Sequence, residues 1–130
     1  MEMAILNHVT GTHSHETRAM QIVVRDMATL AQMPLVDVPV NFATEMLLVV
    51  TLGRVNSDQF SVSIDRVFRD GNQLRVATTI RRPPPGVPMV MASPFCIAVV
   101  PRCDLNVAGF SAEPPIRVRS WQQSPPPEGF

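Results

Sequence analysis

The chain contains neither lysine nor tyrosine, and its 130 residues include only two cysteines and one tryptophan. Without lysine, the protein cannot use Schiff-base catalysis or the lysine of a phosphate-binding loop. Without tyrosine, it lacks one common general acid. Eleven arginines balance eleven acidic residues, and no basic patch marks a nucleic-acid-binding surface. A net charge of zero also removes repulsion between copies, which favours a homo-oligomer.

Long hydrophobic runs are also missing. No segment approaches the roughly 18 continuous apolar residues of a membrane-spanning helix. The first six residues lack the basic region and apolar stretch of a signal peptide. The sequence is equally compatible with a cytoplasmic protein and with one whose leader has been removed. A hydrophobic content of 45% with 17% charged residues is typical of a globular protein rather than a disordered one.

Composition along the chain predicts three segments. Residues 1–19 form a polar N-terminal arm rich in His, Thr and Ser. Residues 20–121 form a single β-rich domain, which is long enough to bury one core. Residues 122–130 form a disordered proline-rich tail.

Alternating apolar residues predict the strands of this domain. Alternation is clearest on both sides of Asp70-Gly71, the strongest hairpin signal in the chain, and predicts a strand pair over residues 60–82. Residues 46–52 are apolar on both faces, which is typical of a central strand covered on both sides. Three further strands are predicted at residues 20–25, 95–100 and 116–118.

The apolar phase slips within the first strand of the pair, because Ile64 and Val67 cannot lie on one face of a regular strand. A β-bulge or bend near Asp65-Arg66 is therefore predicted.

One short helix is predicted after the strand at residues 20–25. Asp26 is its candidate N-cap, and Met27, Leu30 and Ala31 share one helical face. Pro34 ends the helix after about two turns. The predicted fold is therefore α+β and mainly antiparallel, a curled sheet, sandwich or partial barrel with one short helix.

The order of several short motifs resembles one family. The motifs are NFATEM at 41–46, LG at 52–53, FSVSI at 60–64, DGNQLRV at 70–76 and SPFCIAVVP at 93–101. In this order they resemble the C-terminal domain family of PrcB, an accessory subunit of a bacterial surface protease complex. The resemblance covers about half of the chain and departs from the family at Gln59-Phe60, where relatives carry Gly-Tyr.

This resemblance implies a bacterial accessory or binding domain of a cell-envelope or secreted protein, with no catalytic residues to carry over. A protease complex is then one candidate partner. We assign no catalytic, cofactor-binding or metal-binding residue, and we expect no enzyme activity.

His8, His13 and His15, with Glu16 beside them, are the one cluster whose side chains suit zinc or nickel. His13 and His15 lie on one side of the chain if the segment is extended. The alternative is a solvated arm whose histidines bind nothing. A metal- or small-ligand-binding domain is therefore our alternative to the accessory function.

Two other combinations are less favourable. Ser14, His15 and Asp26 include the residue types of a hydrolase triad, but no local signature accompanies them, so we reject a triad. A taut chain from Cys96 to Cys103 spans about 23 Å, whereas disulfide-bonded Cα atoms lie within about 7 Å. A buried strand thiol at Cys96 and an unrelated loop thiol at Cys103 are favoured over a disulfide.

The prolines between Pro83 and Pro88 predict a stiff exposed loop, either a proline-rich ligand or a plain connector. Met89 and Met91 form either an adaptable exposed surface or one buried strand face. Two arginine pairs either bind anions or discourage pairing at strand edges, namely Arg81 with Arg82 and Arg117 with Arg119. Our leading hypothesis is a non-catalytic domain that binds a protein partner through a sheet edge or the proline-rich loop.

Overall fold

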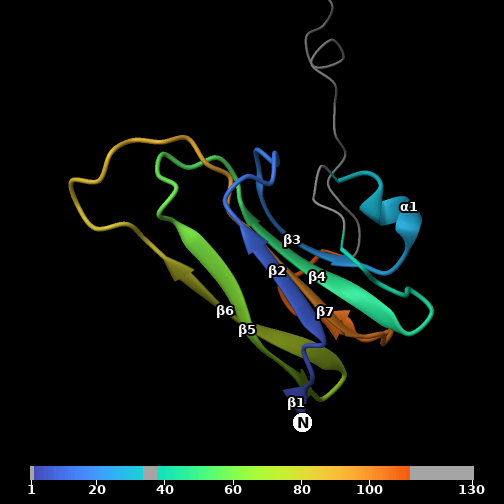
Figure 1. The fold of residues 1–130 in the computed structure, drawn as a ribbon. Coiled ribbons are helices and arrows are strands. Elements are labelled where there is room, and N and C mark those ends of the chain that lie inside the picture. The colour runs from blue at the N-terminus through green and yellow to red at the C-terminus, as the bar shows by residue number, and fades with distance from the viewer. Residues whose placement is uncertain (1, 34–37, 112–130) are drawn as a thin grey trace, which may run out of the picture.

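The computed structural model describes residues 2–33 and 38–111, which form a sandwich of two sheets (Figure 1). The strands are β1 (Glu2–Met3), β2 (Asn7–Gly11), β3 (Ala19–Val24), β4 (Glu45–Leu52), β5 (Ser61–Asp70), β6 (Gln73–Arg81), β7 (Phe95–Pro101) and β8 (Asn106–Val107), and the helix is α1 (Met27–Leu30). One sheet has the order β1-β5-β6-β8 and the other β2-β7-β4-β3. The predicted fold class is confirmed, and the described strands form no closed barrel.

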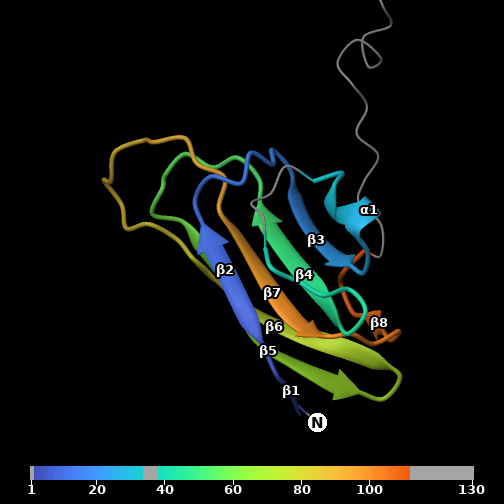
Figure 2. The ribbon, with the colours of Figure 1, turned by 45° about the vertical axis from the view of Figure 1, so that its right-hand side comes forward.

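Strands β4 and β7 lie side by side at the centre of their sheet, with β2 and β3 outside them (Figure 2). Every residue from Met46 to Thr51 and from Phe95 to Val100 is buried. Such continuous apolar strands need cover on both faces of the sheet. The prediction of a doubly covered strand at residues 46–52 is therefore confirmed.

The two covered faces belong to two separate hydrophobic clusters. The inner cluster lies between the sheets and joins one face of β4 and β7 to Val62, Val67 and Leu74 of the β5–β6 hairpin. The outer cluster lies on the opposite face of β4 and β7. Its cover in the described part of the chain comes from five residues, namely Leu30, Met33, Val38, Val40 and Phe42.

The β5–β6 hairpin confirms both the predicted turn and the predicted bulge. Asp70 pairs with Gln73 across a two-residue loop, whose first residue, Gly71, has a φ of +63°. A positive φ at this position is typical of hairpin turns that begin with glycine. The register shifts between Ile64 and Arg66, so Asp65 is the extra residue of the bulge.

Two hydroxyls bond to the carboxylate of this bulge residue. Thr79 on β6 donates a hydrogen bond to Asp65 Oδ2, and Ser63 Oγ donates to Oδ1 at 2.8 Å. These bonds, chiefly the one from Thr79, hold the pKa of Asp65 below its usual range, because they stabilise the charged form.

Helix α1 begins as predicted but is shorter. The Asp26 side chain accepts a hydrogen bond from Thr29 N at 2.7 Å, which confirms it as the N-cap. That bond is also the main reason why the pKa of Asp26 is lowered. The predicted apolar face is wrong for Met27, which is 64% exposed, and for Ala31, which is also exposed. Leu30 packs on the outer cluster instead, since a single helical turn can present only a narrow face to the sheet.

Two other expectations need correction or fall outside the described residues. Residues 2–11 do not form a separate arm, because β1 pairs with β5 and β2 pairs with β7, one strand in each sheet. These pairings give protein partners to backbone polar groups that a solvated arm would leave to water. The strand predicted at residues 116–118 and the tail predicted at residues 122–130 lie outside the described residues.

Thr79→Val removes the hydroxyl donor but keeps the β-branched shape, so the pKa of Asp65 should rise toward its ordinary value of 3.8. The folded-state pKa is lowered, so the stability from this carboxylate is present above about pH 3.8 and is lost as the pH falls through the folded-state value. The difference in unfolding free energy between wild type and variant is therefore largest near neutral pH and shrinks in acid. Carboxyl NMR titration and urea unfolding at several pH values measure both effects. An unchanged Asp65 pKa in the variant contradicts the assigned bond.

Candidate functional site at the loop end of the sandwich

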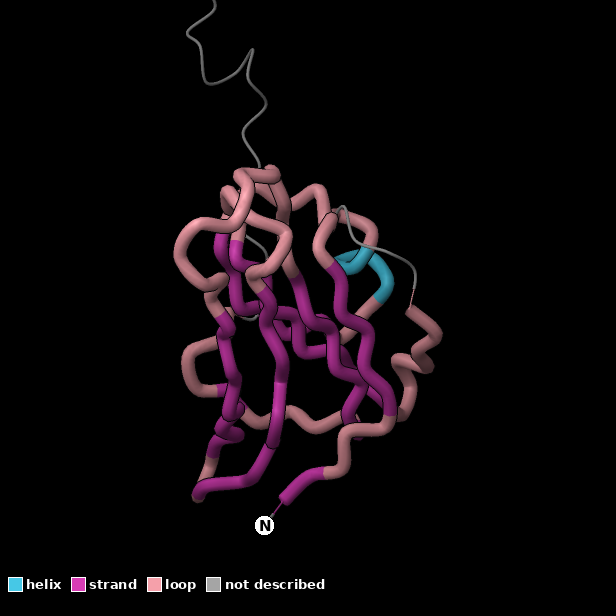
Figure 3. The backbone as a smooth tube through the Cα atoms, turned by 60° about the vertical axis from the view of Figure 1, so that its left-hand side comes forward, coloured by secondary structure: helices cyan, strands magenta, loops and turns pink. Residues whose placement is uncertain are grey.

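Three loops gather at the end of the sandwich away from the N-terminus (Figure 3). They comprise residues 12–18, 53–60 and 82–94, and we call this region the loop end. Backbone hydrogen bonds join the second and third loops, with Val55 and Ala92 bonded in both directions at 2.8 and 3.0 Å. Val90 N also donates to Asn56 O at 3.0 Å. The loops therefore support one another rather than standing alone.

Ser93 holds the first loop against the third. Its N–H donates to Thr12 O at 2.7 Å, and its carbonyl accepts from Ser14 N at 2.9 Å. Its hydroxyl accepts from His15 N at 3.2 Å. His15 has a φ of +64°, and no other non-glycine residue of the described chain has a positive φ. The segment therefore turns sharply at His15, so the extended conformation that would place His13 and His15 on one side is not adopted.

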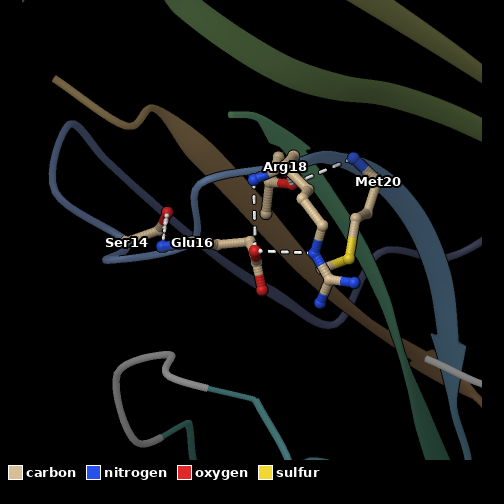
Figure 4. Close-up of polar contacts among 5 residues, drawn as sticks. Ser14, Glu16, Arg18 and Met20 are labelled. Carbon is tan, nitrogen blue, oxygen red and sulfur yellow. Dashed lines mark hydrogen bonds and ion pairs between the residues drawn. The ribbon is translucent and has the colours of Figure 1, made fainter. Parts of the chain in front are cut away.

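A buried polar network underlies the first loop (Figure 4). Glu16 is 1% exposed, and its Oε2 accepts from Arg18 N at 3.1 Å and Arg18 Nε at 3.3 Å. Glu16 N donates to the buried Ser14 Oγ at 3.0 Å. Thr51 Oγ1 donates to Arg18 O at 2.7 Å and accepts from Met20 N at 3.0 Å. Because a buried carboxylate needs such partners, this network fixes the path of the loop into β3.

Gly53, just after β4, allows this close packing. It has a φ of +74°, and a Cβ there would lie 2.9 Å from Ala19 N and 3.0 Å from Arg18 C. A side chain would therefore be strained and would press on the backbone that the network holds. The Leu-Gly pair at residues 52–53 is explained by this approach.

A shallow pocket of about 180 Å³ opens between the loops. The His13 and His15 side chains, the buried Glu16 and the exposed Arg54 all contribute to its lining. Met91 and Ser93 from the third loop complete it, together with Thr17 and Ala92. The pocket is open to solvent, and its wall mixes apolar atoms with charged groups of both signs.

The third loop carries the most exposed apolar segment of the described chain. Met89 is 79% exposed, Val90 41% and Met91 57%. The alternative that placed these methionines on a buried strand face is wrong, and their exposure is as the other alternative predicted. The stiff loop predicted between Pro83 and Pro88 likewise contains no strand, and most of its residues are exposed.

The predicted histidine cluster is only partly assembled. His13 and His15 share the pocket, but His8 lies on β2 and does not line it. His13 Nδ1 is 2.9 Å from Thr12 Oγ1. Within residues 2–33 and 38–111, no three His, Cys, Asp or Glu side chains are placed to share a metal ion.

The rejected triad is not assembled in the described chain. Asp26 caps α1 through Thr29 N, whereas Ser14 Oγ accepts from Glu16 N. Strand β3 separates Asp26 from the first loop, and six residues at about 3.3 Å each put them roughly 20 Å apart.

Cys96 and Cys103 are both free, which confirms the reading of two unrelated thiols. Cys96 is buried in β7, and burial is the main reason why the pKa of its thiol is raised. Cys103 is partly buried and packs against the inner cluster.

The arginines fall in different places. Arg81 ends β6 and Arg82 begins the third loop, and both are exposed. The pair Arg117 and Arg119 lies outside the described residues.

Sequence reasoning missed the role of Glu16, which was grouped with the histidines as a ligand. The spacing of Glu16 and Arg18, two residues apart beside Ser14, is the signal for a local ion pair.

Comparisons with protein-family models, curated proteins and solved structures found no match for this chain. The resemblance to the PrcB family therefore stays a prediction.

In the described part of the chain, α1 is the one helix, and it is too short to cross a membrane.

Thr51→Val keeps the shape of the side chain but removes the hydroxyl that serves Arg18 O and Met20 N. Two backbone groups then lose their partner, so the free energy of unfolding should fall by at least about 2 kcal/mol. Thr51→Ser keeps the hydroxyl and loses one methyl group, so the free energy of unfolding should fall by about 1 kcal/mol. Chemical unfolding of both variants measures the difference. A valine variant as stable as the serine variant contradicts the role of this hydroxyl.

Proposed function

We propose that the domain is a non-catalytic accessory module that binds a protein partner through residues 89–91 of the loop end. The observation that carries this proposal is the run of three consecutive exposed apolar side chains on one loop. Single exposed apolar residues are normal on protein surfaces, but a continuous patch is typical of an interaction site. Methionine suits such a surface because its flexible side chain adapts to different partners.

The loop is held in place within this segment and directly after it. Backbone bonds tie Val90 to Asn56 and Ala92 to Val55. The prolines between Pro83 and Pro88 restrict the chain before it. A loop that is already ordered loses less conformational entropy on binding, which raises its affinity for a partner.

Charge around the segment indicates what the partner carries. Arg54 lines the same pocket as Met91, and Arg82 begins the loop. Neither arginine forms an ion pair with another of the described residues. An apolar partner surface with an acidic rim therefore fits best, because it would cover the methionines and pair with the Arg54 guanidinium group.

The resemblance to the PrcB domain family agrees with this proposal, since it implies an accessory role in a larger complex. A subunit of a protease complex is the partner class that it suggests.

Site-specific photo-crosslinking in the native host tests the proposed surface. A photoreactive amino acid, p-benzoylphenylalanine, replaces Met89 or Met91 in the full chain, and Asn72 in the opposite hairpin turn serves as the control position. We expect one adduct of the same discrete mass from positions 89 and 91 and none from position 72. Adding Val90→Asp should remove this adduct, because a buried carboxylate would face an apolar partner.

Two results would overturn the proposal. One is the absence of a discrete adduct from positions 89 and 91. The other is an adduct pattern that is identical at positions 72, 89 and 91, since it would indicate random collision. Circular dichroism and melting temperature of each variant show that the fold is intact.

A further inference from the structure

The four edges of the two sheets are protected to different degrees. Strands β1 and β8 have two residues each, and short edge strands offer little template for pairing. The β3 edge is covered at its centre, where Ser111 exchanges backbone hydrogen bonds with Gln21 and Val23 at 2.8 and 2.9 Å. The uncovered part of β6 ends at Arg81, and β5 has its bulge at Asp65. Charged residues and bulges are both known to discourage edge pairing.

Strand β2 has none of these protections in the described structure, apart from one local bond in which His8 N donates to Asn7 Oδ1 at 2.9 Å. Its five residues, Asn7–Gly11, include no charged residue and no proline. All five pair with β7 in an unbroken register, so no bulge bends this edge away. One side of β2 pairs with β7, and no other described strand pairs with its second side. A regular, uncharged edge of this kind is a template for another strand.

Open space adjoins the C-terminal end of β2, and Arg81 lines one side of it. A groove of about 350 Å³ lies between Thr10 on β2 and Ser61 and Ser63 on β5. His8 and Thr10 are exposed, whereas Val9 is partly buried and extends the outer cluster to the edge of the sheet.

We propose that β2 pairs in antiparallel orientation with β2 of a second copy of this chain, about a two-fold axis at Val9. The β2-β7-β4-β3 sheets of the two copies then form one continuous sheet across the dimer. Isologous pairing of this kind uses the same surface on both copies and closes without further growth. The zero net charge of the chain means that two copies do not repel each other.

The side chains of β2 favour this register. With the axis at Val9, Val9 faces Val9 of the other copy, and His8 faces Thr10. The two valines then join the outer apolar clusters of both copies, because Val9 lies on that face opposite Ile97. An axis at His8 would instead place two imidazoles together and Val9 against Asn7. Apolar cross-strand pairs stabilise a sheet, so the register centred on Val9 is favoured.

Cysteine crosslinking tests the register in the full chain. Cys103→Ser removes the partly buried thiol, and Cys96 is kept because it is buried. Directly opposite Cβ atoms in paired strands lie about 4.5–5.5 Å apart, close to disulfide distance. We expect Val9→Cys to form a disulfide-linked dimer under mild oxidation. His8→Cys alone and Thr10→Cys alone should crosslink slowly, whereas the two variants expressed together should crosslink readily with each other. Mass spectrometry distinguishes the products.

Sedimentation equilibrium tests the interface without cysteines. Thr10→Arg adds a charge at the edge and should raise the dimer Kd at least about tenfold. Thr44→Arg makes the same change at another exposed threonine and should leave the Kd unchanged. Melting temperatures of both variants show whether each protomer is folded.

A chain that stays monomeric at all concentrations overturns the proposal. So does a dimer in which Val9→Cys fails to crosslink, since the copies then associate through another surface. Crosslinking of Thr10→Cys to a different protein, with the chain itself monomeric, identifies this edge as a site for a foreign strand and also overturns the dimer.

Discussion

Burial of β4 and β7 on both faces is the constraint on which the rest of the structure depends. A strand pair with apolar residues on every position cannot be stable at a surface, so it requires cover from two sides. The β5–β6 hairpin supplies the cover on the inner face. The region of α1 and residues 38–42 supplies it on the outer face in the described chain. The sandwich, the short helix and the edge positions of β2 and β3 all follow from this arrangement.

The loop end is ordered because its loops are anchored to the same two strands, β4 and β7. Thr51 is buried near the end of β4, and its hydroxyl holds the chain where the first loop enters β3. Phe95 begins β7 directly after the third loop, so the exposed segment at residues 89–91 is connected to a rigid strand by only three residues. The proposed binding surface is thus anchored to a doubly covered strand pair, which would order it before a partner binds.

The sequence predicted those features that local chemistry decides. Alternation, the slip of phase at Asp65 and the Asp-Gly signal each depend on residues close together in the chain, and the structure confirms them. Strand β2 was missed because Val9 is its one strongly strand-forming apolar residue, and its conformation depends on pairing with β7, almost ninety positions away. The burial of Glu16 was missed for the same reason, since Thr51, Gly53 and Ser93 hold its loop from distant parts of the chain. The histidines are neighbours in sequence, but the positive φ of His15 sets their final positions.

Native-state hydrogen exchange tests the central role of β4 and β7 most directly. The account predicts that amides of these two strands exchange last and together, with an opening free energy equal to that of global unfolding. One part of the β5–β6 hairpin is not flanked by β1 or β8, namely Ser61 to Ile64 and Thr78 to Arg81. Its amides should exchange earlier, through local opening. If β7 exchanges by local opening while that part of the hairpin stays protected to the global limit, the account is contradicted.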